Sequence, residues 1–253
     1  MTMFSLTERI ALVTGSSRGI GYAIAEALGN AGARIVLNGR SRSDLDDAAA
    51  RLEAAGIATA ISLFDVTDPA AATRAVGVIE QEIGAIDILV NNAGIQRRAP
   101  LDMFEDDDWR ELMATNLDSV YYVGKAVARH MIPRGRGKII NIGSVQCELA
   151  RPGIAPYTAS KGAVKNLTKG MCADWARHGL QINAIGPGYF ATPLNRALVE
   201  DPQFDQWLRG RTPAGRWGKL EDLHGVAVFL ASSASDFVNG QTIYVDGGIL
   251  SVI

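Results

Sequence analysis

Residues 9–21, RIALVTGSSRGIG, place an apolar run directly before a cluster of glycines. The run predicts a buried β-strand over 9–14, and the pattern after it predicts a helix over 19–32. The glycines that permit a tight turn and close backbone approach are Gly15, Gly19 and Gly21. A helix N-terminus beside them attracts an anion. The spacing TGxxxGxG differs from GxGxxG, and a plain strand-to-helix turn is the alternative, but this position favours dinucleotide binding.

The same order of strand and helix continues along the chain. Further strands are predicted at 33–38, 57–66, 85–92, 137–144, 180–188 and 241–248. Helices are predicted at 41–56, 68–83, 105–132, 156–178 and 220–232, with Ser43 or Asp44 as the cap of the first of these. Strands separated by helices pair in parallel through right-handed crossovers. We therefore expect an α/β protein: a single doubly wound Rossmann-type domain over 1–253 with a central parallel sheet of about seven strands.

Composition excludes several classes of partner. Lys and Arg number 25 against 27 Asp and Glu, so no global field favours nucleic acid or an anionic membrane. No apolar run reaches the length of a signal peptide or a membrane span. Cys147 and Cys172 are too few for a disulfide framework, and the three histidines lack metal-ligand spacing. We expect a cytoplasmic protein with no metal, nucleic-acid or membrane partner.

The end of the second predicted strand indicates the type of dinucleotide. Enzymes that bind NAD place an acid about 20 residues beyond the glycines to hold the ribose hydroxyl. Here Asn38, Gly39 and Arg40 occupy that stretch, and no acid precedes Asp44. Arg18 and Arg40 suit the 2′-phosphate of NADP, although two solvated arginines are the alternative. The residues therefore predict NADP(H) rather than NAD(H).

Tyr157 and Lys161 form a candidate acid–base pair. Four residues apart in a predicted helix, they share one face. A free tyrosine has a pKa of about 10, and a neighbouring ammonium lowers this pKa toward neutrality. Ser144 ends the predicted strand 137–144, where its hydroxyl suits a substrate oxygen. A lone Tyr-x-x-x-Lys is common by chance, so the combination with the glycine loop and the serine carries the inference.

Together these motifs resemble the short-chain dehydrogenase/reductase family over residues 9–250: TGSSRGIG, NNAG (91–94), Asn116 in ATNLDS, Ser144, Tyr157 with Lys161, and Gly186-Pro187-Gly188. The resemblance implies that Tyr157 is the general acid or base, that Ser144 positions the reacting oxygen, that Lys161 lowers the tyrosine pKa, and that Asn116 holds a water in the proton relay. It also implies the cofactor-binding set: Gly15, Ser17, Arg18, Gly19, Ile20, Gly21, Arg40, Asp65, Val66, Asn92, Ala93, Gly94, Tyr157, Lys161, Pro187, Gly188 and Thr192. Homotetramers are common in this family, so we expect one here.

Three segments bear on the substrate: 95–100, 144–153 and 188–218. The first segment contains Arg97 and Arg98, and an arginine suits a carboxylate. The second adds Gln146, Glu148 and Arg151 after Ser144, and an amide such as Gln146, with Ser144 and Tyr157, suits the hydroxyl groups of a substrate. These segments resemble sugar-acid dehydrogenases of the family, which implies reversible interconversion of D-gluconate and 5-dehydro-D-gluconate.

Several alternatives remain open at this point. One alternative is an enzyme of the same family that acts on 2-dehydro-3-deoxy-D-gluconate or on another polyol or sugar acid. The other is a cofactor-binding regulator without catalytic activity. Neighbouring side chains in an extended segment point to opposite sides, so we expect one of Arg97 and Arg98 to reach the substrate. Residues 189–218 have the length of a substrate lid.

Overall fold

One parallel sheet of seven strands forms the centre of the molecule, as expected, in the computed structural model, which describes residues 3–192 and 195–252. The order across the sheet is β3-β2-β1-β4-β5-β6-β7. The strands are β1 (Ile10–Val13), β2 (Arg34–Gly39), β3 (Thr59–Leu63), β4 (Ile86–Asn91), β5 (Gly137–Ile142), β6 (Leu180–Pro187) and β7 (Thr242–Val245).

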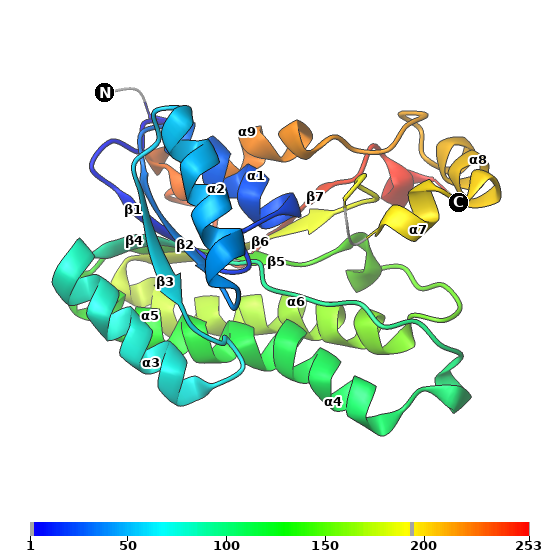
Figure 1. Ribbon diagram of the computed structural model, residues 1–253, viewed down its shortest axis with the longest axis horizontal. Coiled ribbons are helices and arrows are strands. Elements are labelled where there is room, and N and C mark those ends of the chain that lie inside the picture. The colour runs from blue at the N-terminus through cyan, green and yellow to red at the C-terminus, as the bar shows by residue number, and fades with distance from the viewer. Residues whose placement is uncertain (1–2, 193–194, 253) are drawn as a thin grey trace.

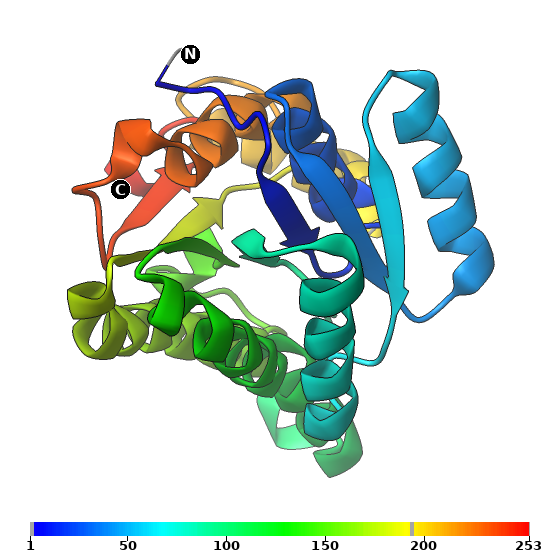
Figure 2. The same ribbon diagram turned by 90° about the vertical axis from the view of Figure 1, so that its left-hand side faces the viewer.

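Helices cover both faces of the sheet, as Figures 1 and 2 show. One layer contains α1 (Gly19–Asn30), α2 (Arg42–Ala54) and α9 (His224–Ala231), which share a buried apolar cluster with the strands. The opposite layer contains α3 (Pro69–Val78), α5 (Ser119–Arg134) and α6 (Ala155–Trp175), packed on a second cluster. The remaining helices are α4 (Asp106–Met113), α7 (Arg196–Val199) and α8 (Pro202–Arg211).

The strand order reverses beside β1, which pairs with β2 on one side and β4 on the other. In a doubly wound sheet, the connections on either side of such a reversal leave in opposite directions, and a crevice opens at the carboxyl ends of the strands. The glycine turn after β1 and the NNAG segment after β4 both lie at this edge. The topology therefore places two predicted motifs on the two sides of one crevice.

Two local predictions differ from the structure. The N-cap of α2 is Ser41 and not Ser43 or Asp44, because the helix already begins at Arg42. The Ser41 hydroxyl accepts a hydrogen bond from the amide of Asp44. The predicted helix 105–132 is α4 and α5 joined by a π-helical turn, Ala114–Asp118. Within the two described stretches, no helix has both the length and the apolar character needed to cross a bilayer.

Candidate active site

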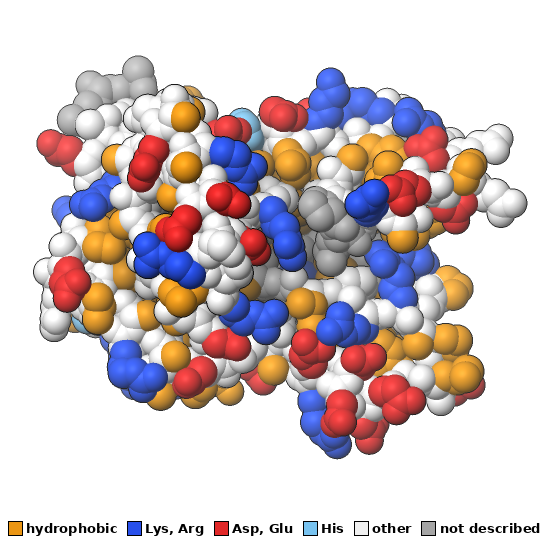
Figure 3. Space-filling model, in the orientation of Figure 1, with side chains coloured by type: hydrophobic (Ala, Val, Ile, Leu, Met, Phe, Trp, Pro, Cys, Tyr) orange, Lys and Arg blue, Asp and Glu red, His pale blue; other side chains and the backbone are white. Residues whose placement is uncertain are grey.

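A cavity of about 710 Å³ opens at the carboxyl ends of the strands. Its size is typical of small-molecule and cofactor sites. Every residue that the sequence assigned to cofactor, substrate or catalysis lines this cavity except Gly21 and Asn116, which lie behind its wall. The molecular surface is hollowed on the face that Figure 3 shows, with Lys and Arg side chains around the hollow. The structure thus collects residues from the connections that follow six strands, β1 to β6, into one site.

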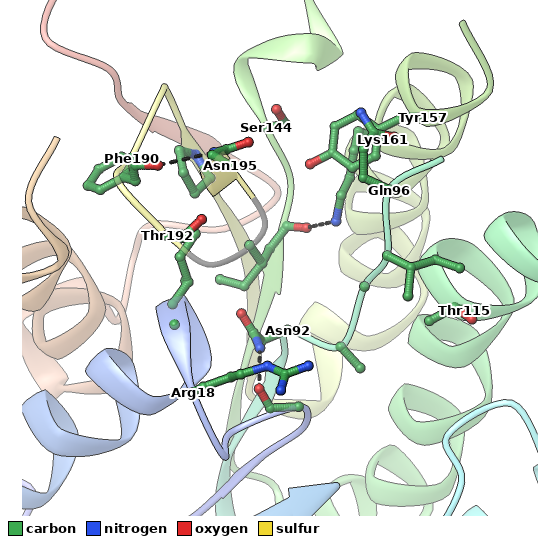
Figure 4. A pocket seen from close by; sticks show the side chains of 18 of the residues that line it. Arg18, Asn92, Gln96, Thr115, Ser144, Tyr157, Lys161, Phe190, Thr192 and Asn195 are labelled. Atoms are coloured by element: carbon green, nitrogen blue, oxygen red, sulfur yellow. Dashed lines mark hydrogen bonds between the residues drawn. The ribbon is translucent and has the colours of Figure 1, made fainter. Parts of the chain in front are cut away.

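The glycine turn after β1 forms a close-packed cradle. Gly15 has φ +61°, and a Cβ on it would lie 2.9 Å from the Cα of Ala93. A Cβ on Gly21 would lie 2.4 Å from both Gly15 O and Asn92 Nδ2. The Asn92 amide donates to the carbonyls of Thr14 and Gly15 at 2.9 Å, as Figure 4 shows in part. Side chains are therefore excluded here for steric reasons, and the backbone remains accessible.

Helix α1 begins in this cradle without a side-chain cap. Its N-cap residue is Arg18, and no side-chain hydrogen bond caps the first turn. The first amide groups of a helix need an acceptor and carry partial positive charge. Ser17, Gly19 and Ile20 line the cavity at the same point. An anion such as a phosphate fits this arrangement.

The segment directly after β2 contains no acidic residue before Asp44. Asn38 is buried, and its Nδ2 donates to the carbonyls of Ser62 and Phe64 at 3.1 Å. Beyond it, the exposed Arg40 lines the cavity, as does the exposed Arg18. Asp44 also lines the cavity, from the first turn of α2. Arg18 and Arg40 thus each bring a guanidinium group to the cavity, which is a favourable environment for a phosphate monoester.

Asn116 hydrogen-bonds the backbone of the cavity wall. It is fully buried in the π-helical turn, where its Oδ1 accepts from Ile95 N at 2.8 Å and its Nδ2 donates to Ile95 O at 3.0 Å. A Cβ on Gly94 would lie 3.4 Å from Asn116 Oδ1 and 3.8 Å from Lys161 Nζ. Asn116 therefore holds the segment after NNAG in place beside the lysine.

Ser144, Tyr157 and Lys161 come together at the ends of β5 and α6 (Figure 4). Tyr157 and Lys161 lie one turn apart on α6, with Lys161 Nζ 5.8 Å from the tyrosine ring centroid. Lys161 Nζ donates to the carbonyl of Ile142 at 2.7 Å. The Ser144 hydroxyl accepts from Gln146 N at 3.1 Å, and Ser144 lies close enough to Tyr157 to lower the pKa of its phenol.

The pKa of Tyr157 differs from the expectation. Burial raises it to about 12, and the hydrogen bond from Ser144 and the charge of Arg98 lower it only in part. Burial also lowers the pKa of Lys161, to about 8, because its ammonium is desolvated. The predicted lowering by Lys161 is therefore wrong for this geometry, and the phenol is protonated at neutral pH.

Arg97 and Arg98 have different surroundings. Arg97 donates to Asp108 at 3.2 Å and to Glu111 at 2.6 Å, both on α4. Arg98 is exposed to the cavity, where partial desolvation and the charge of Arg151 lower its pKa, while Tyr189 and Tyr157 raise it. Arg98 is thus the arginine of the pair that faces the phenol of Tyr157.

Residues that the sequence did not assign to a site also line the cavity: Gln96, Thr115, Ile154, Asn195 and Leu198. Arg151, Tyr189 and Phe190 line it too, and all three lie in segments that the sequence had singled out. Arg151 lies in the 144–153 segment that we had singled out, but its extended backbone gives no periodic signal. Tyr189 follows the Pro187-Gly188 motif directly and accepts from Gln146 Nε2 at 3.3 Å. For both Arg151 and Tyr189, the sequence signal was their position close to a motif that lines the cavity.

Residues 189–218 form one wall. Tyr189, Phe204 and Trp217 stack with centroids 5.6 to 6.1 Å apart, and Trp217 Nε1 donates to Asp205 at 2.7 Å. This packing attaches α8 to the end of β6. Residues 193–194 of the predicted lid lie outside the described residues.

Comparisons with known proteins agree with this geometry. A family model described as enoyl-(acyl carrier protein) reductase matches residues 15–250. The chain is 62% identical over 247 residues to gluconate 5-dehydrogenase of Gluconobacter oxydans (strain 621H), covering 98% of this chain and 96% of that protein. It is 47% identical over 253 residues to 2-dehydro-3-deoxy-D-gluconate 5-dehydrogenase of Formosa agariphila, covering 99% and 96%.

One similar solved structure contains ligands. A gluconate 5-dehydrogenase from Burkholderia cenocepacia J2315, in complex with NADP and tartrate, superposes with a TM-score of 0.97 at 60% identity. The match covers 99% of this chain and 98% of that one.

Proposed function

The chain belongs to the short-chain dehydrogenase/reductase family, and from that premise we propose that it interconverts D-gluconate and 5-dehydro-D-gluconate with NADP(H). The observation that carries the proposal is the pairing, in one cavity, of a protonated phenol at Tyr157 with a cationic wall that contains Arg98. The Tyr157 phenol can donate the proton that a carbonyl reduction needs. The cationic wall can bind the carboxylate of a sugar acid.

NADP(H) fits the residues present. The uncapped start of α1 and the glycine cradle suit the pyrophosphate, and Arg18 with Arg40 suits the 2′-phosphate. Asp65 and Val66 line the adenine side, and Asn92, Ala93, Gly94, Pro187, Gly188 and Thr192 line the remainder of the cleft. The relative that binds NADP in its crystal structure supports the same assignment. Bound at this site, the cofactor supplies or accepts the hydride.

The side chains divide the remaining work. In the reductive direction, the Tyr157 hydroxyl donates its proton to the substrate carbonyl oxygen, and Ser144 hydrogen-bonds the same oxygen. A phenol with a pKa of about 12 is protonated at neutral pH, so it has a proton to donate. Lys161, whose Nζ donates to Ile142 O beside Tyr157, is our candidate for binding the nicotinamide ribose. Asn116 keeps the adjoining wall in position and is our candidate for the proton relay.

The substrate fits the other end of the cavity. Arg98 is placed to bind the carboxylate, and Gln146, whose Nε2 is held by Tyr189, is placed to bind hydroxyl groups. The greater similarity to gluconate 5-dehydrogenase than to 2-dehydro-3-deoxy-D-gluconate 5-dehydrogenase favours gluconate. Intact Ser144, Tyr157 and Lys161 argue against a silent regulator.

The test is oxidation of D-gluconate with NADP, followed by identification of the carbon that carries the new carbonyl. Formation of 5-dehydro-D-gluconate supports the proposal. No oxidation of gluconate, together with rapid oxidation of 2-dehydro-3-deoxy-D-gluconate, would replace it with the second substrate.

Three attributes accompany this role. We propose that the segment 189–218 is the substrate lid, since Tyr189 and Phe190 line the cavity and Phe204 of α8 packs on Tyr189. A homotetramer would cover the exposed apolar side chains of Leu101, Met103, Trp109 and Tyr121 around α4 and α5. Cys147 and Cys172 are free thiols, which suits the reducing cytoplasm.

A further inference from the structure

Arg151 brings a second cation to the substrate end of the cavity. It lies in the connection between β5 and α6, and Arg98 lies in the connection between β4 and α4. A Cβ on Gly153 would lie 3.9 Å from the carbonyl oxygen of Ala99, so the two connections lie side by side. The charge of Arg151 disfavours the protonated form of Arg98. Two like charges are thus held close together across one part of the cavity.

Neither guanidinium has an acidic partner within residues 3–192 and 195–252. Arg151 Nε is buried and has no hydrogen-bond acceptor there. The acid in the same connection, Glu148, is already engaged by Lys165 and by the hydroxyl of Tyr244 at 2.6 Å. Arg97, by contrast, is neutralised by Asp108 and Glu111. A buried donor without an acceptor costs free energy, which an anionic ligand would recover.

An aromatic side chain from α8 holds Arg151 in place. The Arg151 guanidinium carbon lies 5.5 Å from the centroid of the Phe204 ring. Phe204 is in turn packed on Tyr189, Trp207 and Trp217. A guanidinium stacked on a fixed ring keeps its fork in one orientation, which reduces the entropy lost when it binds a carboxylate.

The same end of the cavity also offers acceptors. Gln96 Oε1 and Gln146 Oε1 are buried without a hydrogen-bond donor in the described part of the chain. Both side chains line the cavity beside the arginines. Carbonyl oxygens of this kind accept from hydroxyl groups. Unpaired cations together with unpaired carbonyls complement a polyhydroxy acid.

We propose that Arg151 is a specificity-determining residue, which binds the substrate carboxylate together with Arg98 and is positioned by Phe204. The inference deepens the proposed function and rests on it. On this proposal, the preference for an acid over a neutral polyol comes from the two cations Arg98 and Arg151. Arg151 is also in contact with Phe204 of α8.

The test uses the NADP complex and tartrate as a carboxylate probe, with threitol as its neutral counterpart. Arg151→Gln should weaken tartrate binding about 10-fold or more and leave threitol binding within about 2-fold. Arg110→Ala, which removes an exposed arginine of α4, is the matched control. Phe204→Leu should raise the KM for 5-dehydro-D-gluconate several-fold with little change in kcat, and Phe204→Tyr should restore it.

Two results would overturn the assignment. One is unaltered tartrate affinity in Arg151→Gln, and the other is an equal loss for tartrate and threitol, since either removes the link to charge. Wild-type protein that binds tartrate through Arg151 but does not reduce 5-dehydro-D-gluconate would refute the proposed function alone. Failure of the wild type to bind tartrate refutes the carboxylate site itself.

Discussion

The Arg97 Nη2 atom lies 2.6 Å from Glu111 Oε2, so α4 engages the first of two adjacent arginines and leaves the second facing the cavity. Both arginines line the cavity, but Asp108 and Glu111 of α4 pair with Arg97 alone. The chain thereby uses one arginine for structure and presents the other to substrate.

This division predicts unequal effects of two matched substitutions. Arg98→Ala should lower kcat/KM for 5-dehydro-D-gluconate by about 10- to 100-fold, mainly through KM, because a charge-assisted hydrogen bond is lost. Arg97→Ala should change kcat/KM by less than about 3-fold and cost about 1 kcal/mol of stability or less, since its ion pairs are half-exposed. Steady-state kinetics of both variants decide the matter, and the reverse order of effects would contradict it.

Tyr157→Phe isolates the proton transfer. Removing the hydroxyl should reduce kcat by about 10²- to 10⁴-fold, the contribution usual for general acid–base catalysis. NADPH affinity, measured by fluorescence titration, should stay within about 3-fold, since the ring itself is kept. Turnover close to that of the wild type would remove Tyr157 from the mechanism.

Burial of Lys161 predicts a pH-dependent stability. Its pKa is about 8 in the folded protein, against about 10.4 in an unfolded chain. Between these values the unfolded chain binds more protons, so this group adds stability as the pH rises from about 8 to 10. Below about pH 8 both states are protonated and the buried charge destabilises the folded state.

Lys161→Met therefore provides the comparison. The stability of the variant relative to wild type should be greatest at pH 7 and should fall by on the order of 2–3 kcal/mol by pH 10. Urea unfolding of both proteins at several pH values measures this difference and cancels the titration of other groups. A difference that stays constant with pH would mean that the lysine is not desolvated.

Arg40 allows a test of cofactor choice. Arg40→Ser should lower kcat/KM for NADPH by about 10-fold or more, because a charged contact to the 2′-phosphate is removed. The value for NADH should hardly change, since that cofactor lacks the phosphate. Initial rates with both cofactors give the ratio, and an equal fall for the two would show that Arg40 acts on the fold and not on the phosphate.

The parts of the fold and site that were predictable from sequence are those with a local pattern. Apolar runs located all seven strands, and the glycine turn and the Tyr157–Lys161 spacing located the cavity from two sides. The cap at Ser41 was missed because several nearby residues can cap a helix, and only the backbone path selects one. The π-helical turn at Asn116 has no local sequence signal, and the partner of the Asn116 side chain, Ile95, is 21 residues away in the sequence.

Electrostatic predictions failed where burial competes with charge. Spacing alone placed an ammonium beside a phenol and implied a lowered tyrosine pKa, but both groups are desolvated, and that effect is larger. Arg151 was noted in the 144–153 segment, but the sequence assigned it no specific role. The proposed role depends on interactions of Arg151 with Phe204 and Arg98, which lie in other parts of the chain. No pattern within the 144–153 segment could predict these interactions.

The most direct test of the proposed function is NADPH consumption on addition of 5-dehydro-D-gluconate to the purified protein. The structure predicts rapid loss of NADPH absorbance with stoichiometric formation of D-gluconate, and loss of that activity in Tyr157→Phe. Unchanged absorbance with active, cofactor-binding protein, or equal turnover of neutral ketoses, would contradict it.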